Sequence, residues 1–311
     1  MLSLIKSLFT MNFLLTVIRL STPIFFASIA SFIAGITGIG NIAIESIMTF
    51  GALAGILGSY VTSNAWLGLL VGLCIGILTA LLIAFFSMKL GASSIFVVIA
   101  LNTFADSLAI FFLYQIAGEK GTSASLLTPT LSTVNLPGLS SIPVLGDLLS
   151  GQYVLTYLCW ILLVFLYVLV YKTPLGMRMR ACGLNPDAAK TAGVNVERLQ
   201  VLSLVMSGIF AALGGMYLSL HSLRIFSKGM VAGQGWMGIA ANGIANGSYG
   251  VLLLSSLIFA AFRAVSIVFN TSAILPTDLV STVPYLAVFI FVTGASIINY
   301  YRVKHGKVEE Q

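Results

Sequence analysis

Charged residues are scarce in this sequence. Asp, Glu, Lys and Arg together make up 8% of its 311 residues, whereas a soluble domain averages about 25%. So few charges cannot cover a water-facing surface of ordinary size. Hydrophobic residues make up 59% of the chain and form unbroken runs such as residues 67–86. Because barrel strands alternate apolar and polar residues whereas spanning helices do not, the sequence predicts an all-α, polytopic helical membrane protein.

Cysteine and histidine are also rare. The cysteines Cys74, Cys159 and Cys182 form no C-x-x-C pair, and His221 and His305 have no neighbouring metal-ligating residues. Disulfide frameworks and structural metal sites need several such residues at characteristic spacings. The sequence therefore predicts neither a disulfide framework nor a metal site.

The short motifs of the common enzyme classes are missing. We find no nucleophile elbow, zinc-protease helix or dinucleotide fingerprint. A P-loop is also missing, since "GEKGTS" at residues 118–123 does not have the required spacing. We therefore expect no enzyme activity and no cofactor in this chain. If ATP drives its function, a separate subunit should bind and hydrolyse the ATP.

Positive charge gives an orientation. The net charge is +6, and the basic residues lie mostly between hydrophobic runs, without the interleaved aromatics of a nucleic-acid surface. Basic residues place loop 172–198 and the C-terminal tail after residue 301 in the cytoplasm, and the polar loop 118–150 outside. Counting the membrane crossings from the cytoplasmic loop 172–198 back toward the N-terminus puts the N-terminus outside, despite its basic residues. An extra crossing or a re-entrant segment before residue 50 would remove that conflict.

Hydrophobic runs divide the chain into segments of about the length that a bilayer requires. They predict a single transmembrane domain over residues 1–311 with about 8–10 crossings, some of them short or re-entrant. This indicates a multi-pass protein of the cytoplasmic membrane. The segments lie near residues 13–35, 42–62, 66–87, 94–117, 153–171, 199–221, 236–248, 251–270 and 282–301.

Two segments are interrupted by Gly and Asn, one in each half of the chain. They cover residues 35–55 and 233–250. Paired interruptions of this kind point to a transport pathway near the bilayer midplane. Close packing of helices through small residues is the alternative explanation for the glycines.

Polar residues within these apolar segments are candidates for lining the pathway. An intramembrane carboxylate such as Glu45 is expensive and therefore a functional candidate, although it could instead bond to backbone amides of a broken helix. The others form pairs four residues apart, a spacing that suits either a wet cavity or interhelical hydrogen bonds. Arg263 could extend to the cytoplasmic side or pair with an acid such as Asp106. The candidate pathway residues are Asn41, Glu45, Asn102, Asp106, Asn242 and Asn246.

The loop 172–198 contains the signals of one short helix. Asn185 is a good N-cap, Pro186 suits the first helical position, and Asp187 suits the positive end of the helix dipole. Gly193 is suited to the C-terminal stop. A helix of about seven residues is unstable alone, so it must pack against something. We expect a cytoplasmic partner, with an ordinary surface helix as the alternative.

The stretch "TPLGMRMRACGLNPDAAKTAGVNVERLQ", followed by "SGIFAALGGMYLSL", spans residues 173–220 and resembles a known signature. It is similar to that of permease subunits of ABC importers in the branched-chain amino acid/ribose-type superfamily. The stretch "GIGNIAIESIMTFGALAG" at 38–55 resembles the nucleoside and simple-sugar branch, which is linked to basic membrane lipoproteins. The departures, Ser46 in place of the usual Gly and "NGSYG" after the second interrupted segment, lie in the expected pathway and bear on the solute.

The resemblance implies a fold similar to type II ABC importers, and a permease that translocates nucleosides. Simple sugars or branched-chain amino acids are the alternative solutes, and an ion-gradient-driven secondary transporter using Glu45 and Asp106 is the alternative class. The implied partners are a cytoplasmic ABC ATPase, a second permease subunit in a heterodimer, an extracytoplasmic substrate-binding lipoprotein and membrane lipid, with no nucleic acid. The helix that couples to the ATPase would involve Gly183, Asn185, Pro186, Asp187, Ala188, Ala189 and Gly193.

Overall fold

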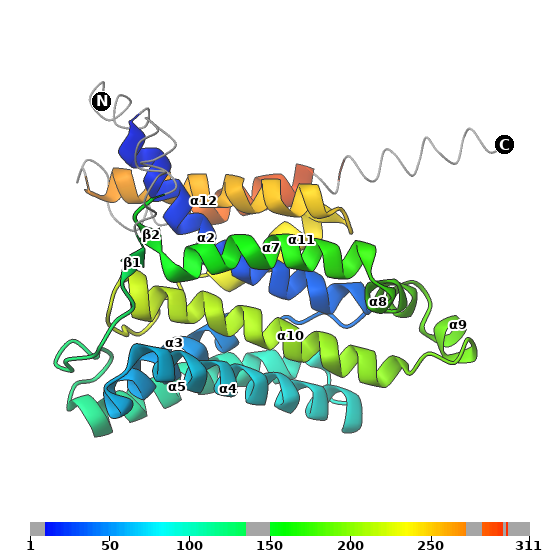
Figure 1. The fold of residues 1–311 in the computed structure, drawn as a ribbon, viewed down its shortest axis with the longest axis horizontal. Helices are drawn as coiled ribbons and strands as arrows, with labels where there is room; N and C mark the ends of the chain where they lie inside the picture. Colours follow the sequence, from blue (N-terminus) through cyan, green and yellow to red (C-terminus); the bar gives the residue numbers. More distant parts are fainter. Residues whose placement is uncertain (1–9, 135–149, 272–281, 295–296, 298–311) are drawn as a thin grey trace. The chain divides into compact units, whose positions relative to one another are not determined.

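The computed structural model describes residues 10–134, 150–271, 282–294 and 297. Two compact units divide the chain: Thr22–Ile239, called the larger unit below, and Met1–Ser21 with Ala240–Gln311, called the smaller unit. The elements of Figure 1 are α2 (Met11–Ile36), α3 (Ile44–Thr62), α4 (Ala65–Ala84), α5 (Ser94–Ala117), β1 (Thr133–Val134), β2 (Gln152–Tyr153), α7 (Val154–Lys172), α8 (Pro174–Leu184), α9 (Pro186–Thr191), α10 (Val196–Tyr217), α11 (Gln234–Ala245) and α12 (Tyr249–Thr271). One-turn π-helical segments extend α4 over Phe85–Lys89 and α10 over Leu218–Ser222.

Seven of the described helices are long and apolar enough to cross a membrane. They are α2, α3, α4 with its extension, α5, α7, α10 with its extension, and α12. Two more predicted segments are short helices, α11 and Thr282–Gly294. The all-α polytopic fold is therefore confirmed. The final predicted segment continues past residue 297, outside the described residues.

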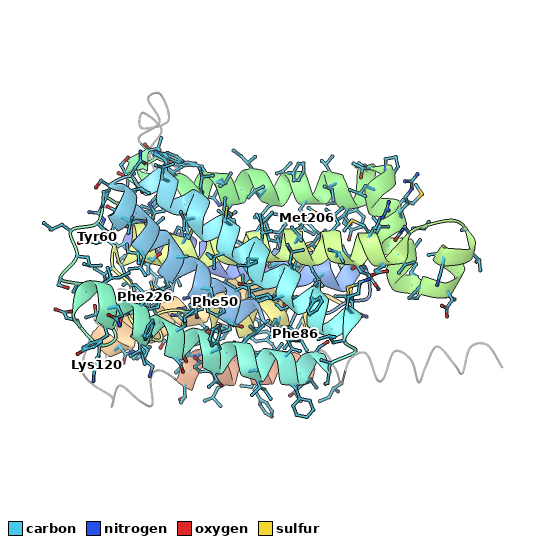
Figure 2. The ribbon with its side chains drawn as sticks, turned by 90° about the horizontal axis from the view of Figure 1, so that it is seen from below. Phe50, Tyr60, Phe86, Lys120, Met206 and Phe226 are labelled. Atoms are coloured by element: carbon cyan, nitrogen blue, oxygen red, sulfur yellow. The ribbon has the colours of Figure 1, made fainter. Side chains whose placement is uncertain are left out.

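Burial separates the central helices of the larger unit from its outer ones. In the most apolar windows, 78% of α3 and 72% of the α10 span are buried, against 17% of α5 and 28% of α7. Apolar side chains such as Tyr60 and Phe86 remain exposed, whereas Phe50 is buried (Figure 2). Exposed apolar surface of this extent suits lipid or a second membrane subunit rather than water.

Close approach of backbones joins α3, α4 and α10. A Cβ atom at Gly51 of α3 would lie 2.7 Å from the Cα of Ala212 in α10. One at Gly76 of α4 would lie 2.9 Å from the carbonyl oxygen of Gly208. Small residues let membrane helices approach this closely, and the resulting dispersion contacts hold the helices together. Packing is therefore the role of these glycines.

The two loops that flank α7 lie at opposite ends of the larger unit. α7 begins directly after β2 and ends two residues before α8, and Figure 1 shows β1 and β2 at one end with α8 and α9 at the other. We call these the β-end and the α9-end. This arrangement agrees with the expectation that residues 118–150 and 172–198 face opposite sides of the membrane, although residues 135–149 lie outside the described part.

The contacts of α2 test whether an extra crossing precedes α3, which would reconcile the crossing count with the basic residues of the N-terminus. The Thr22 hydroxyl donates a hydrogen bond to that of Thr156, which lies at the β-end start of α7 (3.4 Å). At the other end of α2, the Ile36 backbone packs against Gly183 of α8. The part of α2 in the larger unit, residues 22–36, therefore runs from the β-end toward the α9-end, and the described residues contain no further crossing between it and α3. The described residues thus contain no extra crossing that would remove the conflict, and the side of the N-terminus stays a prediction.

The described part of the loop after α5 is bonded to the segment after α10. Ser123 donates its N–H to the Phe226 carbonyl (2.9 Å) and accepts the N–H of Phe226 on its hydroxyl (2.8 Å). The Leu131 carbonyl lies 3.1 Å from Nδ1 of the buried His221. The sequence predicted only an external loop here. The described half of this loop is hydrogen-bonded to the segment after α10, and we call it the β-end cover.

Candidate functional site

The break between α2 and α3 is fixed to α10 by polar side chains. The Thr37 and Ser203 hydroxyls lie 2.6 Å apart. Asn41 donates its amide N–H to the Ser207 hydroxyl (2.9 Å) and accepts the N–H of Ala43 on its oxygen (3.0 Å). The Asn41 side chain is buried, and both ends of its amide are bonded within the protein. Such bonding favours the structural explanation of Asn41, and its pathway role stays a prediction.

Glu45, in the first turn of α3, holds the start of α11. Its two carboxylate oxygens accept the N–H groups of Gly233 and Gly235, each at 2.8 Å. The first N–H groups of a helix lack intrahelical partners and carry partial positive charge, so a carboxylate there is doubly favoured. A Cβ atom at Gly235 would lie 2.7 Å from the Glu45 backbone nitrogen. Glycine at 235 therefore lets the carboxylate approach.

The same carboxylate borders a cavity of about 260 Å³ in the larger unit. The cavity lies between α3, α5 and the segment that leads into α11. Both explanations considered for Glu45 thus hold in part, because it bonds to backbone amides and also lines a polar cavity. We call this cavity the Glu45 pocket, and its lining residues are Glu45, Ser46, Thr49, Asn102, Asp106, Gly229, Val231, Ala232 and Trp236.

Two more of the predicted residues reach the Glu45 pocket from α5. Asp106 is exposed, and among the described residues it makes no hydrogen bond or ion pair. The Asn102 Oδ1 atom is buried and has no hydrogen-bond partner in the described part of the chain. Buried carbonyl oxygens are normally bonded, so this acceptor is suited to a ligand or a water molecule. The spacing of four residues correctly put both side chains on one face of the helix.

Trp236 is the pocket residue that sequence reasoning missed. It lies in the first turn of α11, directly after the glycine that contacts Glu45, and its side chain is 43% exposed. An aromatic residue in an apolar segment gives no distinctive signal. The interrupted segment around it was the available clue.

The third predicted pair lies in the smaller unit. Asn242 is half-buried within α11, and Asn246 is exposed immediately after it. Asn246 has a φ of 43° and is followed by Gly247 with a φ of 84°. Left-handed residues at this position end helices, and Asn is the non-glycine residue that best tolerates the conformation. The geometry of Asn246 favours helix termination, and the pathway role of both residues stays a prediction. Arg263 lies half-buried in α12 of the smaller unit.

At the α9-end, the short predicted helix is present as α9. The Asn185 side chain accepts the N–H of Ala188 (3.0 Å), and Pro186 occupies the first helical position. After the helix, the N–H of Gly193 bonds to the Lys190 carbonyl and that of Val194 to the Ala189 carbonyl, both at 3.0 Å. Gly193 has a φ of 81°. These two bonds are the Schellman pattern, so both ends of the helix are closed by local contacts.

A second helix in the loop, α8, was not predicted. The Thr173 hydroxyl accepts the N–H of Gly176 (3.2 Å), and Pro174 occupies the first helical position. These are the same cap and proline signals as at Asn185 and Pro186, so the sequence did contain them. Of the coupling residues, Gly183 lies in α8 and packs on the backbone of Ile36.

The surface of α9 is mostly exposed. Ala188 is exposed, whereas Ala189 packs inward with 5% of its surface exposed. The adjoining Leu184 is 88% exposed. A groove of about 580 Å³ borders the helix and is lined by Pro186, Asp187, Lys190, Gly193, residues 194–197 and Gln200.

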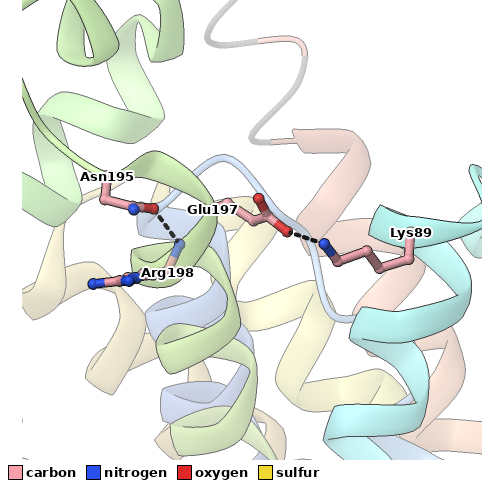
Figure 3. Close-up of polar contacts among 4 residues, drawn as sticks. All are labelled: Lys89, Asn195, Glu197 and Arg198. Carbon is pink, nitrogen blue, oxygen red and sulfur yellow. Dashed lines mark hydrogen bonds and ion pairs between the residues drawn. The ribbon is translucent and has the colours of Figure 1, made fainter.

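The start of α10 is bonded to the end of the α4 span and is capped by an exposed side chain. Lys89 and Glu197 form an ion pair at 3.1 Å, and Asn195 caps α10 by accepting the N–H of Arg198 at 3.0 Å (Figure 3). The Lys89 contact brings the end of the α4 span to the α9-end. The loop between α4 and α5 therefore lies at the same end as loop 172–198.

Comparison with known proteins places these features in a family. Residues 13–293 match the family model described as the permease component of branched-chain amino acid transport systems. The nucleoside ABC transporter permease NupC of Lactococcus lactis is 31% identical over 255 residues, covering 80% of each chain. The guanosine ABC transporter permease NupQ of Bacillus subtilis is 28% identical over 287 residues, covering 88% of each. A solved structure described as PsaBC from Streptococcus pneumoniae in complex with Fab has a similar fold, with a TM-score of 0.51, 16% identity and 95% of each chain covered.

Proposed function

The chain belongs to the family of permease components of branched-chain amino acid transport systems, and from this premise we propose that it translocates nucleosides as part of an ATP-driven importer. The observation that carries the solute class is the similarity, over most of the chain, to permeases named for nucleosides and guanosine. The chain is a multi-pass membrane protein, and we assign the α9-end and the C-terminus to the cytoplasm. This assignment rests on the positive charge of residues 172–198 and of the tail after residue 301.

In this proposal the solute passes through the larger unit, where Glu45, Asn102 and Asp106 meet in one cavity. A separate ATPase subunit binds ATP and contacts α9. An extracytoplasmic lipoprotein delivers the solute to the β-end, and a second permease chain completes the pathway. Support for the ATPase contact comes from α9, which is closed at both ends and exposes Ala188, and from the exposed Leu184 at the end of α8.

Uptake of labelled uridine and guanosine tests the solute class in cells with and without the gene for this chain. We expect deletion to abolish most ATP-dependent uptake of at least one nucleoside, and the restored gene to return it. Unchanged uptake of both, together with reduced uptake of ribose, would overturn the nucleoside assignment. Uptake that survives ATP depletion while the proton gradient persists would overturn the ATP-driven mechanism.

A substitution on α9 tests the ATPase contact. Because Ala188 is exposed, Ala188→Glu adds charge and bulk at the proposed contact without disturbing the buried Ala189. We expect loss of nucleoside uptake and of the ATPase activity that co-purifies with the tagged chain, at normal membrane levels. Ala124→Glu adds the same charge at an exposed alanine of the opposite, β-end loop and should retain the co-purifying ATPase activity. Equal behaviour of the two variants would count against the contact.

A further inference from the structure

The Glu45 pocket combines negative charge with an aromatic surface. Its nine lining residues include two carboxylates, those of Glu45 and Asp106, and no Lys, Arg or His. The two carboxylates differ in what they already bind. Glu45 is bonded to two backbone N–H groups, whereas Asp106 makes no hydrogen bond or ion pair among the described residues. The charge of Asp106 is therefore open to a solute.

The unfilled acceptors in the pocket call for a solute that donates hydrogen bonds. Besides the Asp106 carboxylate, the buried Oδ1 atom of Asn102 lacks a partner in the described part of the chain. Hydroxyl groups of a sugar and N–H groups of a base can donate to such oxygens. An anionic solute would instead be repelled by the two carboxylates, because no basic side chain lines the pocket to offset their charge.

Trp236 adds a flat apolar surface to the same cavity. Its side chain is 43% exposed and lies beside the carboxylate that fixes the start of α11. Nucleobases stack on aromatic side chains because every base has a π-face, and this interaction tolerates differences among bases. A simple sugar lacks such a face. The cavity volume of about 260 Å³ also lies near the lower end of ligand pockets, roughly 300 Å³, which suits a small solute.

We propose that the Glu45 pocket binds neutral nucleosides and rejects their 5′-phosphates, with Trp236 stacking on the base and with Asp106 and Asn102 accepting hydrogen bonds from the solute. This inference rests on the proposed function and names the residues that set its specificity. Glu45 acts as a positioning residue, because its two bonds hold the start of α11 and hence Trp236 next to α3.

The test combines uptake by the intact transporter with binding to the purified full chain. Labelled uridine is the probe, and uridine 5′-monophosphate and ribose are the competitors. For the wild-type chain we expect competition by unlabelled uridine, and at least tenfold weaker competition by the monophosphate and by ribose. Asp106→Asn removes the charge at nearly constant size. It should raise the uridine KM about tenfold and narrow the discrimination against the monophosphate.

The aromatic contact has its own variant. Trp236→Leu should weaken uridine binding about tenfold while leaving the weak competition by ribose unchanged. Two controls lie outside the pocket: Glu119→Gln replaces an exposed acid, and Trp66→Leu replaces a tryptophan that is 57% exposed. Both should keep the wild-type KM.

The outcomes separate this inference from the proposed function. No nucleoside uptake by the wild-type transporter would overturn the proposed function itself. Wild-type uptake with an unchanged KM in both Asp106→Asn and Trp236→Leu would leave the proposed function in place and overturn the pocket. Equal competition by uridine and its monophosphate would overturn the electrostatic rejection.

Discussion

The Glu45 pocket and the α9 helix are held together in opposite ways. The pocket depends on contacts between residues far apart in the chain, since Glu45 bonds to Gly233 and Gly235. In contrast, α9 is closed by contacts within ten residues, from the Asn185 cap to the bond between Val194 and Ala189. The pocket therefore requires the surrounding fold, whereas the form of α9 is set locally and its surface remains exposed.

This difference suits two separate tasks. A cavity that selects a solute needs fixed distances between its walls, and bonds between distant segments supply them. A surface that meets a partner can remain exposed until the partner covers it. We therefore expect substitutions in the pocket to affect stability and transport together, and substitutions in α9 to affect transport with little loss of stability.

Gly235→Ala should break the pocket and gives the largest expected effect. The new Cβ atom would lie 2.7 Å from the backbone nitrogen and 2.8 Å from the Cα of Glu45, so α3 and α11 must separate. We expect a destabilisation of about 3 kcal/mol from overpacking and weakened bonds to the carboxylate. Thermal unfolding of the detergent-solubilised chain measures it. Gly243→Ala in the same helix is the control, because nothing lies within 4 Å of its Cβ position. A similar loss in both variants would contradict the prediction.

Glu45→Gln tests the two hydrogen bonds to Gly233 and Gly235 without changing the size of the side chain. Its amide oxygen can accept one of the two glycine N–H groups, but its NH2 group would face the other. We expect a loss of about 2 kcal/mol, since hydrogen bonds to a charged group are stronger than neutral ones. Glu119→Gln in the exposed loop should leave the unfolding temperature unchanged. A stable Glu45→Gln chain with normal uptake would show that the two bonds are dispensable.

Asn185→Ala tests the locally closed helix. Removal of an N-cap of this kind costs about 1 kcal/mol of helix stability, and α9 has only six residues over which to absorb it. We expect reduced uptake and reduced co-purifying ATPase activity, with an unfolding temperature close to that of the wild type. Asn195→Ala removes the equivalent cap from α10, which is 22 residues long and contains buried residues from Ser203 to its end. If the two variants lose uptake equally, local closure of α9 is not what limits transport.

Lys89→Ala should have the smallest effect. The ion pair between Lys89 and Glu197 joins side chains that are 66% and 57% exposed. Exposed pairs of this kind contribute little, and salt screens what they do contribute. We expect a change below about 0.5 kcal/mol in unfolding free energy, and one that disappears at high salt. A larger, salt-independent change would mean that Lys89 packs against its surroundings in a way that the ion pair alone does not describe.

Features that are determined locally could be predicted from the sequence, whereas contacts between residues far apart in the chain could not. Hydrophobic runs located the described spanning helices to within a few residues, and the Asn185-Pro186 pair with Gly193 located α9. Thr173 and Pro174 form the same cap and proline signal at the start of α8. The bonds from Glu45 to Gly233 and Gly235 could not be predicted, because no local pattern links residues 188 positions or more apart. Trp236 was missed for the same reason.

The hydroxyl groups of Thr37 and Ser203 take part in three hydrogen-bond contacts but have only two protons to donate. Thr37 can donate to the Ala34 carbonyl (3.0 Å) or to Ser203, and Ser203 can donate to the Gln200 carbonyl (2.8 Å) or to Thr37. Two hydroxyl protons thus serve three contacts, so while the two side chains are hydrogen-bonded to each other, one of the two carbonyls lacks its hydroxyl donor. Rotation of both hydroxyls exchanges the two arrangements without moving a heavy atom. The joint between the end of α2 and the start of α10 therefore exists in two interchangeable forms, each of which keeps the contact between the two side chains.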